Sequence, residues 1–170
     1  MENIEEFEIP EEVVEKLKNP EVIQKHVEDG KTFQEILEFS AEKMEKFYQH
    51  AKFLFDQSKY KEASEAFTFL TTLNPLIPNY WIGLGLSELS QEEYHGGLLS
   101  LAMAIMSDVA NPLPHYYTAL CYRALLQPES ALLSLDLALM HAEEDEDLHK
   151  RATLLKEKIF EEKRKKRESS

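Results

Sequence analysis

Nine side chains of this sequence are spaced so that together they could bind an extended peptide. Within each set of three, the spacing of four and then three residues places all members on one face of a helix. The sets recur at a constant interval of about 34 residues and comprise Tyr48, Lys52 and Phe55; Ile82, Leu86 and Leu89; and Tyr116, Leu120 and Arg123. Most are aromatic or aliphatic, which suits an apolar, proline-containing ligand whose restricted backbone loses little entropy on binding.

Residue types that commonly carry catalysis or bind metals form no comparable pattern. The six His residues lack a metal-ligand spacing such as i, i+4. Gly30-Lys31-Thr32 lacks the upstream glycine of a phosphate-binding loop, because Lys25 stands at that position. Cys121 lies among apolar neighbours and is expected to be a buried, inert thiol. We therefore expect no metal, no cofactor and no enzymatic activity.

Helix pairs that recur with the same period must position the nine side chains. Bulky and small residues alternate at fixed offsets, as in the aligned sets Phe47, Trp81 and His115; Ala51, Gly85 and Ala119; and Ala63, Gly97 and Ala131. This is the tetratricopeptide pattern, in which each helix pair buries its apolar face by stacking on its neighbour. We predict an all-α tetratricopeptide-repeat solenoid of three helix pairs, with an N-terminal helical extension and a C-terminal capping helix.

Six residues at packing offsets are predicted to build the repeat core and not to contact a ligand: Tyr60, Ala63, Trp81, Gly85, Tyr94 and Ala131. The small residues let two helices approach closely, and the aromatic ones fill the spaces between successive pairs. Gly97 costs roughly 1 kcal/mol relative to alanine inside a helix. We therefore expect its helix to be locally soft or unusually close to a neighbour.

Proline, glycine and charged residues divide the chain into three segments. Residues 1–40 form an acidic N-terminal extension, with a helix expected to start at Pro10. Residues 41–142 hold the repeats, whose units by period are 44–77, 78–111 and 112–145. Residues 146–170 form a capping helix with a basic tail. Helices are predicted at 41–57, 60–73, 78–90, 92–107, 112–125, 128–141 and 146–167.

Net charge and composition restrict the classes of partner that this chain is expected to bind. The net charge is −13, and no Lys or Arg lies between Glu62 and Tyr122, so nucleic acid and anionic membranes are disfavoured. A single cysteine excludes an internal disulfide and suits a reducing cytosol. The N-terminus lacks the basic start and apolar run of a signal peptide, and no apolar run is long enough to span a membrane.

Three local sequences carry a more specific resemblance. They are Gly30-Lys31-Thr32-Phe33 ahead of the repeats, Lys59-Tyr60-Lys61-Glu62-Ala63 in repeat one, and Trp81-Ile82-Gly83-Leu84-Gly85 in repeat two. Together with an acidic N-terminal helix, three repeats and one terminal helix, they resemble the class II chaperones of bacterial type III secretion. The similarity covers about residues 10–160.

The resemblance implies a concrete function. Members of that family keep hydrophobic translocator proteins soluble in the bacterial cytoplasm before secretion. They hold a translocator segment spaced like Pro-x-Leu-x-x-Pro in the concave face, and many form homodimers through the N-terminal helical region. We expect the same partners, dimer contact and location for this chain.

Other uses of the fold require different residues or a different ligand. Cochaperones that capture a C-terminal carboxylate need Lys, Asn and Arg in the groove, and this sequence instead has Tyr48, Gly83, Leu113 and Tyr117 at clamp positions. Two alternative functions remain compatible with the sequence. The protein could be an adaptor that binds a peptide of another assembly, or a regulator of secretion genes. Absence of proline-dependent binding would favour the adaptor.

Overall fold

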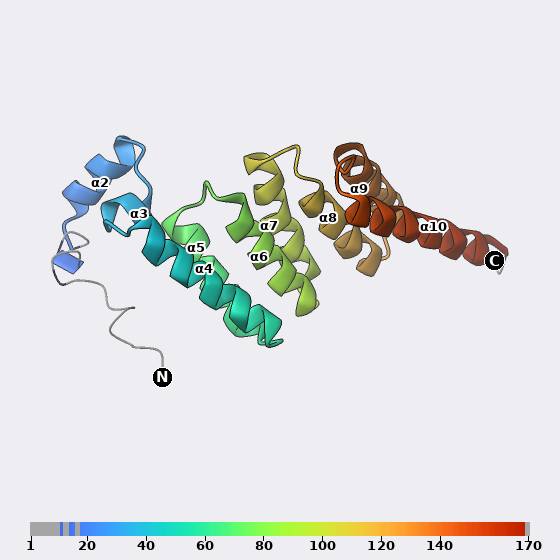
Figure 1. The fold of residues 1–170 in the computed structure, drawn as a ribbon, viewed down its shortest axis with the longest axis horizontal. Coiled ribbons are helices and arrows are strands. Elements are labelled where there is room, and N and C mark those ends of the chain that lie inside the picture. The colour runs from blue at the N-terminus through green and yellow to red at the C-terminus, as the bar shows by residue number, and fades with distance from the viewer. Residues whose placement is uncertain (1–10, 12–13, 16–17, 169–170) are drawn as a thin grey trace.

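The computed structural model describes residues 11, 14–15 and 18–168, and all regular secondary structure of these residues is helical (Figure 1). The helices are α2 (Pro20–Glu28), α3 (Phe33–Ile36), α4 (Ala41–Asp56), α5 (Tyr60–Leu73), α6 (Pro78–Ser90), α7 (Tyr94–Ser107), α8 (Pro112–Ala124), α9 (Pro128–His141) and α10 (Glu146–Glu168). The predicted helix start at Pro10 lies outside the described residues. The all-α solenoid fold is confirmed.

Short polar side chains cap the N-termini of α2, α3 and α4. The Asn19 carboxamide accepts hydrogen bonds from the first turn of α2, and the Ser40 hydroxyl accepts one from the Lys43 N–H at 3.1 Å. Thr32 and Glu35 form a reciprocal capping box at the start of α3. The hydrogen bonds from Thr32 lower the pKa of the Glu35 carboxyl. These caps satisfy backbone N–H groups that have no partner within a helix.

Six of the helices form three antiparallel pairs, α4–α5, α6–α7 and α8–α9, which stack in chain order (Figure 1). One apolar cluster, which includes Phe47, Phe67 and Leu84, joins repeat one to α6. A second cluster, which includes Leu135, Leu148 and Ile159, joins repeat three to α10. Each pair thus buries its apolar face on a neighbour, as a solenoid requires.

Glycines in repeat two permit close approaches between helices that a side chain would crowd. A Cβ added at Gly85 would lie 2.8 Å from Cγ of Leu101, and one at Gly97 would lie 3.3 Å from Sγ of Cys121. Of the two alternatives expected for the helix of Gly97, the structure shows the close approach to a neighbour. Burial, and then the nearby Glu88, raise the pKa of the Cys121 thiol to about 11, so this thiol stays protonated and weakly reactive.

The turn inside each helix pair contains one residue with left-handed backbone geometry. These residues are Ser58, Glu92 and Leu126, with φ angles of 59°, 63° and 58°. Their conformation reverses the chain after the first helix of each pair. In repeat two it delays the second helix until Tyr94, two residues later than predicted.

The C-terminal helix α10 covers the end of the solenoid. Its buried face consists of Leu148, Ala152, Leu155 and Ile159. Ion pairs add to this contact, among them Lys163 with Glu129 at 2.7 Å and Lys156 with Asp136. Among the described residues no helix is long and apolar enough to cross a membrane, and no group of three or more His, Cys, Asp or Glu side chains is placed to bind a metal ion.

Candidate peptide-binding groove

A cavity of about 240 Å³ opens between α4, α6 and the start of α8, and we call it the repeat groove. Its walls come mainly from α4 and α6, the first helices of two successive pairs. Five of the nine predicted contacts line it: Tyr48, Lys52, Phe55, Ile82 and Leu86. The structure therefore brings together the predicted residues of repeat one with two of those of repeat two.

Packing against one ring of repeat one and one ring of α6 fixes the ring of Tyr48 at the wall of the groove. Its centroid lies 6.1 Å from that of Phe67 in an edge-on contact and 5.6 Å from that of Tyr80. The ammonium of Lys52, one helical turn further along α4, lies 5.6 Å from the centroid of the Tyr48 ring. Burial, and then the nearby Glu45, raise the pKa of the Tyr48 hydroxyl, so the ring stays neutral and can pack against apolar groups.

Gly83 and Phe67 together shape the floor of the groove. A Cβ added at Gly83 would lie 2.2 Å from Cε1 of Phe67, so the ring of Phe67 occupies the space that a side chain on α6 would fill. Ile82 is 6% exposed and belongs to the same floor. Phe55 stands at the wall, where its ring centroid lies 5.3 Å from that of Tyr60. The result is a preformed, mostly apolar depression.

Polar groups also line this apolar cavity. Lys52 and Asp56 lie one turn apart on α4, and Asn79 and Asn111 lie at the starts of α6 and α8. Amide and charged groups can bind the backbone of an extended peptide, whereas the apolar floor accepts a side chain such as leucine or proline. The arrangement supports recognition of an extended apolar segment.

The four remaining predicted contacts lie outside the repeat groove. Leu89 and Leu120 are half-buried, and Tyr116 is only 8% exposed. The Arg151 guanidinium of α10 lies 4.9 Å from the centroid of the Tyr116 ring. Arg123 donates a 2.7 Å hydrogen bond to the Glu162 carboxylate of α10. Two of the three predicted contacts of repeat three, Tyr116 and Arg123, therefore meet the capping helix in this structure.

The six residues predicted for the repeat core differ in burial. Ala63 and Ala131 are fully buried, and Gly85 is buried against Leu101. Tyr60 and Tyr94 are half-buried, as is Trp81, whose indole N–H donates a 2.8 Å hydrogen bond to the Pro75 carbonyl. This bond ties the first helix of repeat two to the preceding junction.

Six residues of the repeat groove are not among the nine predicted contacts: Asp56, Phe67, Asn79, Gly83, Asn111 and Leu113. Of these, the sequence placed only Gly83 and Leu113 in the groove, at the positions of a carboxylate clamp. Asn79 carries a signal that could have found it, because 79, 82 and 86 continue one helical face. Leu113 occupies the position of repeat three that corresponds to Asn79 in repeat two. Phe67 comes from a second helix of a pair and reaches the floor only because residue 83 is glycine.

The chain was compared with known proteins by sequence and by structure, and the similarities are structural. No protein-family model matches the sequence, and no curated protein matches it. A chain of the CopN–Scc3 complex is 28% identical, with 76% of this chain and 74% of that chain covered and a TM-score of 0.66. A type III secretion complex from Aeromonas hydrophila is 23% identical, with 83% and 96% covered and a TM-score of 0.78.

Solved translocator chaperones are also similar. SycD, the type III secretion translocator chaperone of Yersinia enterocolitica, is 22% identical, with 75% of this chain and 97% of that chain covered and a TM-score of 0.72. SycD has also been solved with a peptide of the translocator YopD, and PcrH with the chaperone-binding regions of PopD and PopB. This chain therefore has the tetratricopeptide-repeat fold of the type III secretion translocator chaperones.

Proposed function

We propose that this protein is a non-enzymatic chaperone that keeps hydrophobic translocator proteins of a bacterial type III secretion system soluble in the cytoplasm. The repeat groove carries this proposal, because residues of α4 and α6 that share one predicted face line a single apolar cavity. Peptide complexes of SycD and PcrH, which have the same fold, support it. The client segment would be extended and spaced like Pro-x-Leu-x-x-Pro.

The groove suits such a client for physical reasons. An apolar side chain of the client would leave water by packing against Tyr48, Phe67 and Leu86. Prolines on either side would restrict the peptide before it binds, so less backbone entropy would be lost. A short peptide making these contacts should bind with a Kd in the micromolar range, about −8 kcal/mol. The net charge of −13 would help to keep the complex soluble.

A second element of the proposal is self-association. We propose that two copies form a homodimer through the N-terminal helical region, residues 1–40. SycD, which has this fold, has been solved as an alternative dimer. The apolar side chains of Val27 and Phe33 are 52% and 38% exposed and could be covered by a second copy.

Proline-dependent binding tests the chaperone proposal against the adaptor. A labelled Pro-x-Leu-x-x-Pro peptide from a candidate translocator should bind the full chain in the micromolar range. Replacing both prolines by glycine should weaken binding at least about fivefold, because the unbound peptide gains backbone freedom. The measurement is fluorescence anisotropy.

Two results would count against the chaperone proposal. One is the absence of binding by peptides from every translocator encoded with the chain. The other is equal binding of the proline and glycine peptides, which would favour an adaptor that recognises a different segment.

A further inference from the structure

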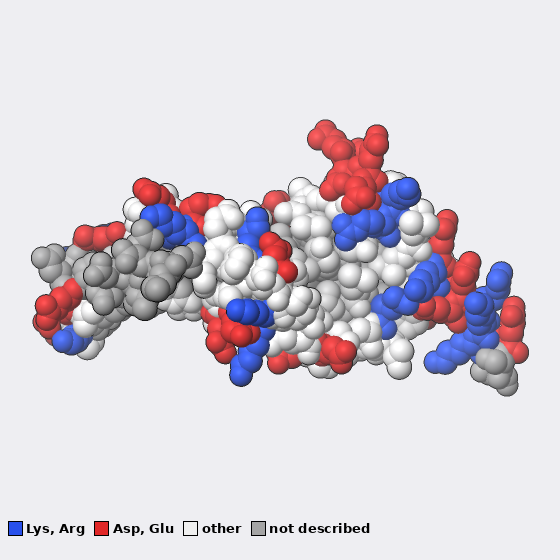
Figure 2. Space-filling view, turned by 60° about the horizontal axis from the view of Figure 1, so that its bottom comes forward, with Lys and Arg blue, Asp and Glu red and all other residues white. Residues whose placement is uncertain are grey.

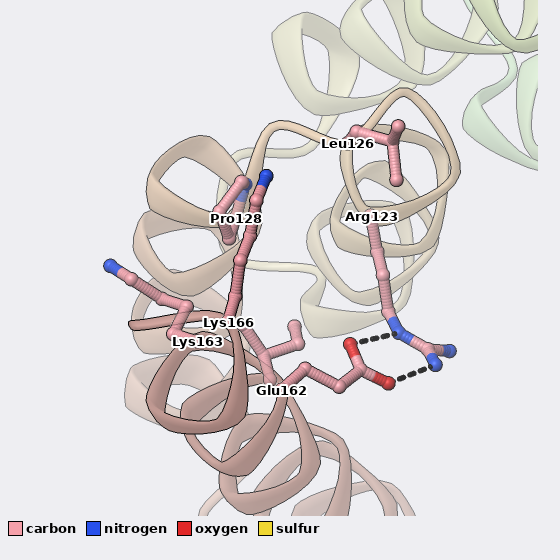
Figure 3. A pocket seen from close by; sticks show the side chains of 7 residues that line it. Arg123, Leu126, Pro128, Glu162, Lys163 and Lys166 are labelled. Carbon is pink, nitrogen blue, oxygen red and sulfur yellow. Dashed lines mark hydrogen bonds and ion pairs between the residues drawn. The ribbon is translucent and has the colours of Figure 1, made fainter. Parts of the chain in front are cut away.

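A second cavity lies where the C-terminal half of α10 crosses the turn between α8 and α9 (Figure 3). We call it the C-terminal pocket. Its volume is about 120 Å³, which is room for roughly one side chain. It shares no lining residue with the repeat groove. Binding of a ligand in this pocket would therefore not depend on peptide binding in the groove.

Leu126 supplies an unusual apolar contact at this pocket. Its side chain is 85% exposed, and its backbone has the left-handed φ of 58°. The same turn position holds Ser58 in repeat one and Glu92 in repeat two. A left-handed leucine costs roughly 1–2 kcal/mol, and an exposed side chain recovers little of this by burial. The fold alone therefore does not require leucine here. With Pro128 and Ile159 it gives the pocket an apolar surface.

Cationic side chains surround this apolar surface. Arg123, Lys163 and Lys166 line the pocket. In the view of Figure 2, Lys and Arg lie among Asp and Glu at the end of the molecule formed by α10. Residues 156–168 hold seven Lys and Arg and four Glu, although the chain as a whole carries a charge of −13. This local reversal of charge is the second property of the pocket.

Two carboxylates at the pocket offset part of this positive charge, and the formal charges of Arg123, Lys163, Lys166, Glu162 and Glu129 sum to +1. Glu162 accepts hydrogen bonds from Arg123, and Glu129 pairs with Lys163 at 2.7 Å. The hydrogen bond from Arg123, with the charges of Arg123, Lys158 and Lys165, lowers the pKa of the Glu162 carboxyl. The hydrogen bond from Lys163, with the charges of Lys163 and Arg167, lowers the pKa of the Glu129 carboxyl. Both carboxyls therefore lie in a positive local potential.

We propose that the C-terminal pocket binds an acidic peptide segment of a partner protein, with one apolar side chain between carboxylates. The apolar side chain would pack against Leu126 and Pro128, and carboxylates on either side would reach Lys163 and Lys166. A nucleic acid strand fits less well, because the described residues that line the pocket include no aromatic ring on which a base could stack.

The test uses the full chain and a fluorescein-labelled peptide of sequence Gly-Glu-Asp-Leu-Glu-Asp-Gly, followed by anisotropy at low salt. K166E should weaken binding by about fivefold or more, since it replaces an attraction by a repulsion. L126S should weaken binding about threefold or more, because the apolar contact is lost. The L126S variant should fold normally, because Ser58 occupies the equivalent turn of repeat one. A peptide with glycine in place of leucine should bind as weakly to the unmodified chain.

K61E is the matched control, because it makes the same charge change on α5, in repeat one. Its binding should equal that of the unmodified chain. Absence of binding, or equal weakening by K61E and K166E, would overturn the proposal. Tighter binding of a single-stranded oligonucleotide of the same charge would also overturn it, in favour of nucleic acid.

The two sites can be separated in the same assay. Y48A should leave binding of the acidic peptide unchanged, and L126S should leave binding of the proline peptide unchanged. Failure of the chaperone proposal would therefore not remove the acidic-peptide site, and failure of the acidic-peptide site would leave the chaperone proposal intact. Loss of acidic-peptide binding in Y48A would place the acidic peptide in the repeat groove and overturn the pocket proposal.

Discussion

Replacing Ile159 by alanine is expected to lower the free energy of unfolding by about 2–5 kcal/mol. Ile159 is 1% exposed and belongs to the apolar cluster that joins α10 to repeat three. Its truncation would remove apolar contacts and leave a cavity that the packed helices could fill only in part. Urea unfolding followed by circular dichroism measures the loss. The corresponding fall in Tm should be about 5–15 °C.

The neighbouring residue supplies the control. Phe160 is 52% exposed, and its replacement by alanine removes a larger side chain from the same helix. Because that side chain is largely in water already, the free energy of unfolding should fall by less than about 1 kcal/mol. Equal losses at the two positions would mean that α10 does not pack on repeat three through the face that contains Ile159.

Replacing Tyr48 by alanine is expected to weaken binding of the proline peptide by about tenfold or more. The Tyr48 ring forms a wall of the repeat groove and is held in place by Phe67 and Tyr80. Its removal would take away apolar contact with the ligand and the rigid surface that shapes the groove. Anisotropy titrations of the unmodified and Y48A chains measure the change.

Y48F separates the ring from its hydroxyl. The ring carries the expected contact, so this variant should bind within about twofold of the unmodified chain. Circular dichroism should show the same helical content for both variants. Undiminished binding by a helical Y48A chain would exclude the Tyr48 wall as a ligand contact, and weak binding by Y48F would show that the hydroxyl is required.

Much of the fold could be predicted because the determinants of a repeat are local and recur. The constant repeat period, together with prolines such as Pro112 and Pro128 at helix starts, fixed the six repeat helices to within two residues. The later start of the second helix in repeat two follows from the left-handed residue Glu92. Nothing in the side-chain type of a glutamate indicates that geometry.

The candidate site was less predictable. The repeat period assigns equivalent positions of every repeat to the site, whatever element packs next to that repeat. Repeats one and two have a following pair, so their inward faces border a cavity. Repeat three is followed by α10, and Tyr116 and Arg123 therefore meet Arg151 and Glu162. The contribution of Phe67 depends on the missing side chain at residue 83, which is a contact between helices and not a sequence pattern.

Site-specific photocrosslinking would test the central claim, that the client segment lies in the repeat groove, most directly. A photoreactive phenylalanine analogue would replace either Phe55, which lines the groove, or Phe53, which is 56% exposed on α4 and does not line the groove. Each variant would be irradiated with a bound translocator. Crosslinks to the Pro-x-Leu-x-x-Pro segment from position 55, with few or none from position 53, are the predicted result. Crosslinks to that segment mainly from position 53, or from neither position while the complex stays intact, would contradict the claim.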